Sequence, residues 1–329
     1  MVSLTTIRQR NLSFAASHPT GYSCVFAGAT SGIGAATLER MFTMLNESTF
    51  YIIGRSETRF AAQRVKLENL NPNNTIVFLE GEFSLLADVD AVCERIGVGA
   101  EKGSMKRVDL LYMSPGMYPL NGPEYTKEGL ETCFAISYYS RLRLLSNLLP
   151  LLRRSPNPRI LNVLSGGREK AILETDIGLE KPENWSSRAI INHTTTMTSL
   201  AFYYLAEKDE NREIVFIHSF PGLVRTQIFA RQTRTGSEGS GWLWRVMLPI
   251  LRVMFAVLMV VLGVDVEESG ESMAFVLTSE RFGRGGVRLV SEKCEVSEEG
   301  GVLRGYLESG WRERVWEFTE GVFERVIAR

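Results

Sequence analysis

A short glycine-rich segment near the N-terminus constrains the fold more than any other feature of the chain. It reads AGATSGIG at residues 27–34, and it lies between an apolar, β-rich run at 22–28 and a helical pattern at 33–45. Glycine lets the backbone turn tightly and approach a bound group closely, and the free N–H groups of the following helix favour an anion. A strand, a glycine turn and a helix in this order predict a dinucleotide site. Its candidate contacts are Gly28, Thr30, Ser31, Gly32, Ile33 and Gly34.

After this loop the chain alternates between strand-like and helix-like patterns. The predicted strands are 22–28, 49–54, 75–80, 108–113, 159–165 and 213–220, and the predicted helices are 33–45, 57–70, 84–96, about 127–153, about 186–208, 267–281 and 311–326. Apolar strands separated by helices indicate a parallel sheet covered on both faces. We therefore predict an α/β fold, a Rossmann-type doubly wound sheet in a single domain. Such a sheet binds its ligand at the carboxyl ends of the strands.

Composition excludes several other classes of protein. The 329 residues carry 37 Lys and Arg against 38 Asp and Glu, so the net charge of −1 offers no basic surface for nucleic acid. The four cysteines form no CxxC pair and the three histidines are widely spaced, so we expect no disulfide scaffold and no metal centre. The first residues lack the apolar core of a signal peptide. These features predict a cytoplasmic protein.

One segment is unusually apolar for such a protein. Residues 243–264 could nearly span a bilayer in length, but Arg245, Pro249 and Arg252 interrupt the first half. The uninterrupted run at 253–264 has only twelve residues, which is too short to cross. We interpret 227–266 as an apolar lid over a lipophilic substrate, inserted in a core of about 20–226 and 267–290. Peripheral contact of 243–264 with a membrane surface is the alternative left open.

The glycine spacing resembles that of the short-chain dehydrogenase/reductase family. The family pattern is TGxxxGIG, and Ala27 stands where the family has Thr. The resemblance covers about residues 20–282, and the layout is similar to a fungal branch associated with secondary metabolism. It implies a nicotinamide cofactor and redox chemistry between a carbonyl and an alcohol.

Residues after the second and third strands imply the type of cofactor. Enzymes of the family that prefer NAD place an acid after the second strand, whereas this chain has Arg55 and Ser56. A cation there can pair with a 2′-phosphate, so Arg55 favours NADP(H), with a solvated surface arginine as the alternative. After the third strand, Glu82 and Phe83 stand where the family contacts adenine with an Asp and an apolar residue.

Two further motifs follow the fourth and sixth strands. The family's Asn-Asn-Ala-Gly is replaced by MSPG at 113–116, which keeps only Gly116. The strand-anchoring hydrogen bonds of the lost asparagines must therefore be replaced or absent. The segment at 221–226 resembles the family's PGxVxT, which contacts the nicotinamide. Its matched residues are Pro221, Gly222, Val224 and Thr226.

The catalytic residues of the family are mostly replaced. Ser165 matches the family's Ser at the end of the fifth strand, and Ser137 stands where the family has Asn. No tyrosine occurs between Tyr139 and Tyr203, and the family spacing places Ile191 and Thr195 at the positions of the Tyr/Lys pair. A literal Tyr-x-x-x-Lys begins at Tyr204, but it lies at the far end of its helix, so we assign it to packing.

Three side chains are therefore candidate proton donors. An imidazole can donate a proton near neutral pH, and His193 lies close to the missing pair. However, His193 also shares a helical face with apolar residues, which favours a packed histidine. Tyr138 and its neighbour Tyr139 are the other candidates.

The leading functional prediction is an NADP(H)-dependent oxidoreductase that acts on a lipophilic small molecule in secondary metabolism. A non-redox catalyst on the same scaffold, such as a cyclase, dehydratase or isomerase, and a catalytically silent cofactor-binding protein are the alternatives. The sequence also leaves open whether the protein forms a homodimer.

Overall fold

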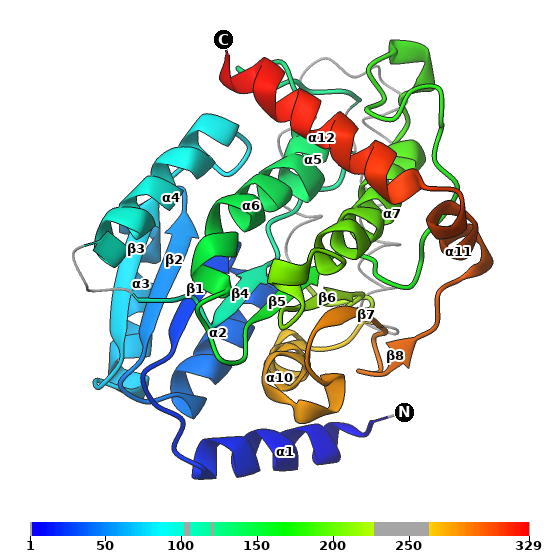
Figure 1. Ribbon diagram of the computed structural model, residues 1–329. Coiled ribbons are helices and arrows are strands. Elements are labelled where there is room, and N and C mark those ends of the chain that lie inside the picture. Colours follow the sequence, from blue (N-terminus) through cyan, green and yellow to red (C-terminus); the bar gives the residue numbers. More distant parts are fainter. Residues whose placement is uncertain (1, 102–105, 120–121, 227–262, 329) are drawn as a thin grey trace, which may run out of the picture.

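The protein is built around one eight-stranded sheet, described here from a computed structural model (Figure 1). The structure describes residues 2–101, 106–119, 122–226 and 263–328. The strands are β1 (Ser23–Ala27), β2 (Thr49–Gly54), β3 (Thr75–Glu80), β4 (Leu110–Met113), β5 (Arg159–Val163), β6 (Val215–Ser219), β7 (Gly286–Val290) and β8 (Val296–Ser297). Their order is β3-β2-β1-β4-β5-β6-β7-β8, and all neighbours are parallel except β7 and β8. This arrangement confirms the predicted doubly wound fold.

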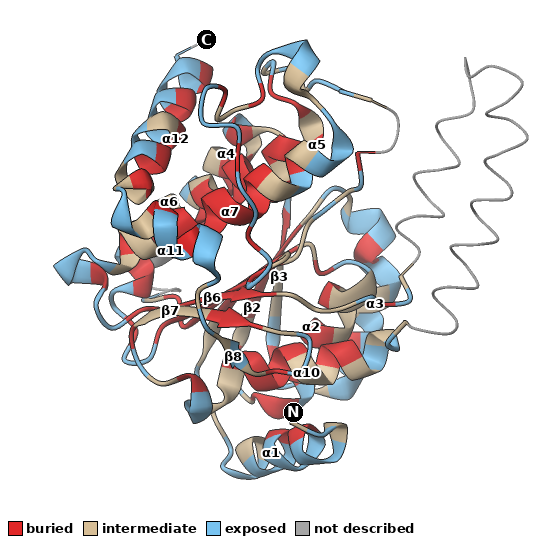
Figure 2. Cartoon of the chain, turned by 90° about the vertical axis from the view of Figure 1, so that its right-hand side faces the viewer, coloured by how far each residue is buried: buried red, intermediate tan, exposed pale blue. Residues whose placement is uncertain are grey.

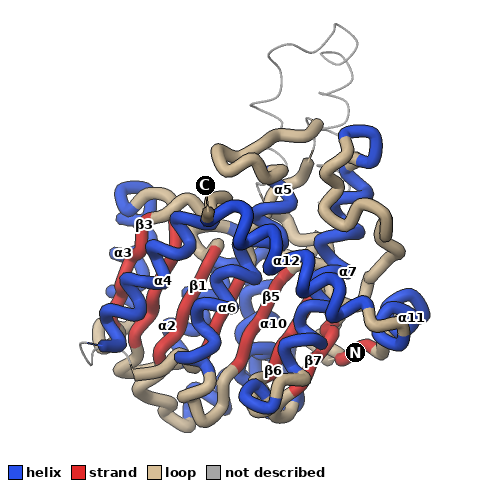
Figure 3. Tube along the Cα trace, turned by 45° about the horizontal axis from the view of Figure 1, so that its top comes forward, coloured by secondary structure: helices blue, strands red, loops and turns tan. Residues whose placement is uncertain are grey.

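Helices cover both faces of the sheet, as Figures 1 and 3 show. One face carries α4 (Leu86–Glu101), α6 (Ser140–Leu152) and α7 (Ser187–Ala206), with α11 (Gly301–Glu308) and α12 (Trp311–Ile327) outside them. The other face carries α2 (Gly32–Met44), α3 (Glu57–Leu70) and α10 (Val266–Thr278), with α1 (Leu4–Ala16) outside.

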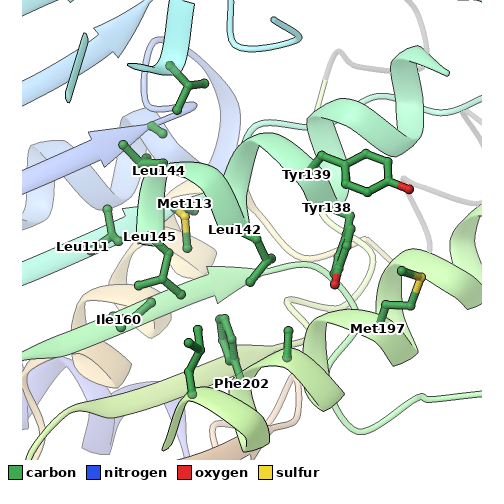
Figure 4. Packing of buried hydrophobic residues seen from close by; sticks show 14 of the residues in the cluster. Leu111, Met113, Tyr138, Tyr139, Leu142, Leu144, Leu145, Ile160, Met197 and Phe202 are labelled. Carbon is green, nitrogen blue, oxygen red and sulfur yellow. The ribbon is translucent and has the colours of Figure 1, made fainter. Parts of the chain in front are cut away.

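Apolar side chains on the two faces form two separate cores. Buried residues concentrate on the strands and on the helix faces turned towards them (Figure 2). Figure 4 shows the first core, where Leu142 and Leu145 of α6 pack against Ile160 of β5 and Phe202 of α7. The parallel strands are buried on both faces, which is why they read as continuous apolar runs in the sequence.

The predicted elements of the core are present, with some differences. The helix predicted at 127–153 is divided into α5 (Thr132–Phe134), a π-helical turn at Ala135–Tyr139, and α6. The elements α1, α11, β7 and β8 were not predicted. The strand β7 is short and begins among glycines, and α1 has only two buried residues, Ile7 and Asn11. Neither therefore shows clear hydrophobic periodicity.

Most of the predicted lid, 227–266, and of the apolar segment 243–264 falls outside the described residues. Within the described part of the chain, no helix is both long enough and apolar enough to cross a membrane.

Candidate cofactor and active site

The glycine loop lies at the carboxyl end of β1, where a side chain has no room. Gly28 has a φ of 78°, and a Cβ atom added to it would lie 2.3 Å from the backbone nitrogen of Pro115. A Cβ on Gly34 would lie 2.2 Å from the carbonyl oxygen of Gly28, so α2 packs directly against the turn after β1. Only glycine fits both positions. The loop therefore presents bare backbone at the N-terminus of a thirteen-residue helix, which suits a pyrophosphate.

Segments from three other strand ends meet around this loop. A Cβ atom added to Gly32 would lie 3.4 Å from the Thr226 methyl group, so the segment after β6 lies close to the start of α2. The Thr30 methyl group lies beside Gly54 at the end of β2. After β4, the Ser114 hydroxyl donates a 3.1 Å hydrogen bond to the Gly28 carbonyl. This bond ties β4 to β1, so Ser114 replaces one strand-anchoring contact that the lost asparagines would make.

The end of β2 carries an exposed cation beside an acid from the end of β3. Arg55 is 70% exposed, and its guanidinium lies 4.0 Å from the Glu82 carboxylate. The Ser56 hydroxyl accepts a hydrogen bond from the Arg59 N–H and so caps α3. Phe83 is buried and lines a small hollow with Ile53 and Val89. Thus Arg55 is available to a ligand, while Ser56 already serves its helix.

These residues fit a nicotinamide dinucleotide. The exclusion of any Cβ at Gly28 and Gly34 leaves backbone for the pyrophosphate, and Arg55 and Glu82 lie at the next two strand ends. In the segment after β6, Gly222 has a φ of 80°, which favours glycine, and Val224 is buried. Pro221 and Thr226 in the same segment are partly exposed.

A buried arginine replaces the remaining anchoring contacts. Arg141 of α6 is 1% exposed and donates 2.7 Å and 2.9 Å hydrogen bonds to the Asn162 Oδ1 and the Val163 carbonyl at the end of β5. It also donates to the Pro115 carbonyl after β4 and, through Nε, to the Ile136 carbonyl of the π-helical turn. Burial lowers the pKa of Arg141 to about 9. The guanidinium therefore fixes two adjacent strand ends beside Gly116, whose added Cβ would lie 3.9 Å from it.

Ser165 begins a tight turn that rests on His218 of β6. The Ser165 N–H lies 3.4 Å from His218 Nε2, and a Cβ on Gly166 would lie 2.0 Å from the His218 carbonyl oxygen. On the other side of the ring, His218 Nδ1 lies 2.8 Å from the Ser199 hydroxyl of α7. Ser199 donates in turn to Glu169 Oε1 at 2.6 Å. Burial, followed by the charge of Arg141, lowers the pKa of His218 to about 3, so its ring is neutral.

The predicted donor His193 is a packed residue with no free nitrogen. It is 2% exposed, its Nε2 accepts the Leu173 N–H at 2.8 Å, and its Nδ1 lies 2.9 Å from the Ile177 carbonyl. Burial lowers the pKa of His193 below its usual value. The ring therefore fastens the loop at 173–177 to α7, which fits the packed alternative rather than proton donation.

Tyr138 and Ser137 lie on the π-helical turn, away from solvent. The Tyr138 phenol is fully buried and lies 2.6 Å from the Thr319 hydroxyl of α12, and burial raises the pKa of Tyr138 (Figure 4). Ser137 is 4% exposed and contacts Cys133 Sγ at 3.8 Å. This environment makes Tyr138 a packing residue, and the Tyr139 ring stacks on Phe134.

The helix α7 carries the two residues that the family spacing predicts at the positions of the Tyr/Lys pair. Ile191 is 42% exposed and Thr195 is 2% exposed. Tyr204, in the literal Tyr-x-x-x-Lys, stacks on Trp316 of α12, and the Lys208 ammonium lies over its ring at 4.2 Å. Tyr204 therefore packs against α12, in agreement with the assignment of this Tyr-x-x-x-Lys match to packing.

Sequence reasoning missed four polar residues around Ser165: Arg141, Glu169, Ser199 and His218. His218 left a usable trace, because it interrupts the apolar run EIVFIHSF near the end of a buried strand. No signal in the sequence marks Arg141, because nothing distinguishes it from Arg143, a partly exposed arginine two residues later. In the described residues, no three His, Cys, Asp or Glu side chains gather as metal ligands.

The comparisons with known proteins agree with this geometry. The family model described as short chain dehydrogenase matches residues 23–175. A protein named oxidoreductase lepF, from Aspergillus flavus, is 32% identical over 363 aligned positions, which cover 99% of this chain and 98% of that protein. The chain belongs to the short-chain dehydrogenase family. It is thus an oxidoreductase of the short-chain dehydrogenase type, and its fold is one that binds nicotinamide cofactors.

Other family members resemble the chain at greater distance. The short-chain dehydrogenase/reductase SAT2 of Stachybotrys chartarum is 30% identical, with 87% of this chain and 80% of that protein covered. Among solved structures, the angucycline C-6 ketoreductase LanV with bound NADP has a TM-score of 0.58 at 16% identity, covering 88% of this chain and 99% of that chain. The NADPH-bound carbonyl reductase from chicken fatty liver has a TM-score of 0.56 at 18% identity, covering 87% and 98%. These two likenesses support the fold.

Proposed function

We propose that this short-chain dehydrogenase uses NADP(H) to interconvert a carbonyl and an alcohol on a lipophilic small molecule of secondary metabolism. The observation that carries the proposal is the glycine loop, where backbone from α2 lies open to a pyrophosphate while Arg55 stands exposed at the next strand end. An exposed guanidinium, rather than a carboxylate, at the end of β2 suits the 2′-phosphate of NADP.

Ser165 is the residue that would orient the substrate carbonyl. It lies at the carboxyl end of β5, between Arg141-anchored strand ends and the segment after β6. The bound nicotinamide supplies or accepts the hydride. The Ser165 hydroxyl donates a hydrogen bond to the carbonyl oxygen, which holds the carbonyl carbon in place and stabilises negative charge on the oxygen.

The expected lipophilic substrate is supported by apolar side chains after three neighbouring strands. Tyr118 after β4, Leu173 after β5 and Leu223 after β6 are 43%, 39% and 42% exposed, respectively. Ile191 on α7 adds a fourth exposed apolar side chain. Because the carboxyl ends of parallel strands share one edge of the sheet, these residues favour an apolar surface beside the cofactor site.

A second candidate function is non-redox catalysis on the same scaffold. The exposed aliphatic side chain of Ile191 favours it, because the family's phenol would stand at that position. A cyclisation, dehydration or isomerisation needs no proton donor matched to a hydride.

The test measures NADPH consumption and product formation together, using purified protein and a panel of polycyclic ketones. We expect NADPH to be consumed in equal amount to the alcohol formed, and a Ser165→Ala variant to lose about 100-fold in kcat while its Kd for NADPH is unchanged. The matched control is Ser146→Ala, a half-buried serine on α6 outside the site whose hydroxyl oxygen is buried. Product formation without NADPH consumption would support the non-redox alternative.

A further inference from the structure

We propose that Glu169, Ser199 and His218 form a buried hydrogen-bond relay that positions the turn bearing Ser165. The catalytic part of this inference rests on the proposed function, because Ser165 orients the substrate carbonyl only in that reaction. The relay crosses three elements that lie side by side, since Glu169 follows β5, Ser199 belongs to α7 and His218 belongs to β6 (Figure 1).

The directions of the hydrogen bonds follow from the backbone. The Ser165 N–H can only donate, so His218 Nε2 must accept and the ring proton must lie on Nδ1. Nδ1–H then donates to the Ser199 hydroxyl at 2.8 Å, and that hydroxyl donates to Glu169 Oε1 at 2.6 Å. Each member therefore has one role: the Ser165 N–H requires the Nδ1–H tautomer of His218, and the Ser199 hydroxyl accepts that ring proton.

The relay returns to the turn where it begins. The oxygen of Glu169 that accepts from Ser199 also accepts the Gly167 N–H at 3.0 Å. The turn is therefore held at Ser165 through His218 and at Gly167 through Glu169. Between them, Gly166 lies so close to the His218 carbonyl that no side chain would fit. These contacts restrict where the Ser165 hydroxyl can point.

Burial makes these hydrogen bonds strong and costly to break. Ser199 and His218 are 0% exposed and Glu169 is 7% exposed. A buried polar group that loses its partner bears the full cost of desolvation. The charged groups that face the ring are Glu169, 3.9 Å from Nδ1, and the Arg141 guanidinium. The ring of His218 is neutral, so it carries no charge of its own beside these two groups.

Three variants on α7 separate the relay from helix packing. Ser199→Ala removes the hydroxyl that links His218 to Glu169, and Ser199→Thr restores it. Thr198→Val is the matched control, because the Thr198 hydroxyl is equally buried but donates only to the Thr194 carbonyl of its own helix. Each variant is measured by ¹⁵N NMR of the histidine rings, by amide exchange of the peptide that holds Ser165 and Gly167, and by steady-state kinetics with NADPH. A His218→Gln variant assigns the His218 signals.

In the unmodified protein and in Thr198→Val, we expect His218 as the Nδ1–H tautomer and a slowly exchanging turn. Ser199→Ala leaves the Nδ1–H of His218 without its acceptor, and the ring can take the Nε2–H form only by releasing the Ser165 N–H. We therefore expect the Nε2–H tautomer to appear together with exchange of the turn at least tenfold faster and a kcat about tenfold lower, with Kd for NADPH changed less than twofold. Ser199→Thr should recover all three.

Two results would overturn the relay. The first is an unchanged tautomer and exchange rate in Ser199→Ala. The second is a changed tautomer with an unchanged kcat. If the unmodified protein turns over no ketone, the proposed function fails, and the tautomer and exchange data alone decide whether the relay holds the turn.

Discussion

Two groups of strand ends at the carboxyl edge of the sheet match the family pattern to different degrees. Around β1, β2 and β6, the glycines, Arg55 and the segment after β6 match the family motifs, and backbone contacts explain why. Around β4, β5 and α7, a buried Arg141 replaces the anchoring asparagines, and Ile191 and Thr195 stand where the Tyr/Lys pair is expected. We therefore predict that cofactor binding in this chain is separable from the chemical step.

The glycine loop should give the largest effect. Gly34→Val places side-chain atoms where the Gly28 carbonyl lies, so we expect loss of measurable NADPH binding, at least 100-fold in Kd, and a large fall in stability. Fluorescence titration and urea unfolding measure the two effects. The control is Gly97→Ala, because nothing lies within 4 Å of a Cβ there and alanine favours a helix. Full binding by Gly34→Val would show that the loop is not built as described.

The buried arginine should come next. Arg141→Met keeps the length of the side chain but leaves the Asn162 oxygen and several carbonyls without their donor. We expect a loss of about 2–4 kcal/mol in the free energy of unfolding, measured in urea. The control Arg143→Met breaks a partly exposed pair with Asp90 and should cost about 1 kcal/mol. Equal losses for the two variants would remove the special role of Arg141.

The neutral, buried His218 should make the free energy of unfolding depend on pH. The pKa of His218 in the folded protein, about 3, lies below the ordinary value of 6.5. As pH falls from about 6.5 towards about 3, the unfolded chain binds the proton first, so stability is lost in this window. His218→Gln should flatten that loss, whereas His18→Asn, at an exposed histidine, should not. Urea unfolding at pH 7 and pH 5 tests the difference, and parallel pH slopes for all three proteins would contradict it.

The smallest predicted effect concerns cofactor preference. Arg55→Ala should weaken NADPH by about 1–2 kcal/mol, roughly five- to thirty-fold, and leave NADH nearly unchanged. The effect is modest because the guanidinium is 70% exposed and its charge is screened. Arg64→Ala, which removes a cation paired with Glu57, is the control. Equal losses for the two cofactors would remove Arg55 from the 2′-phosphate site.

The comparison also shows what a sequence can predict. The six core strands and the glycine loop were predicted because apolar runs and glycine spacing are local properties. The surroundings of Ser165 were not, because Arg141, Ser199 and His218 are far apart in the chain and meet only through β5, β6 and the helices. The residue type alone makes His193 a candidate donor and its apolar helical face favours packing, whereas its two backbone partners, Leu173 and Ile177, depend on how a loop folds back.

One measurement tests most directly whether cofactor binding is separable from the chemical step. The fluorescence of NADPH is followed as it binds to the unmodified protein and then after a generic ketone, such as a simple aryl ketone, is added. We predict saturable binding, followed by a signal that decays no faster than without protein. No phenol stands at Ile191 to donate the proton, and a small ketone lacks the binding contacts that would position the proposed lipophilic substrate for reduction with a proton from water. Rapid loss of the signal with alcohol formation, or no saturable binding at all, would contradict the account.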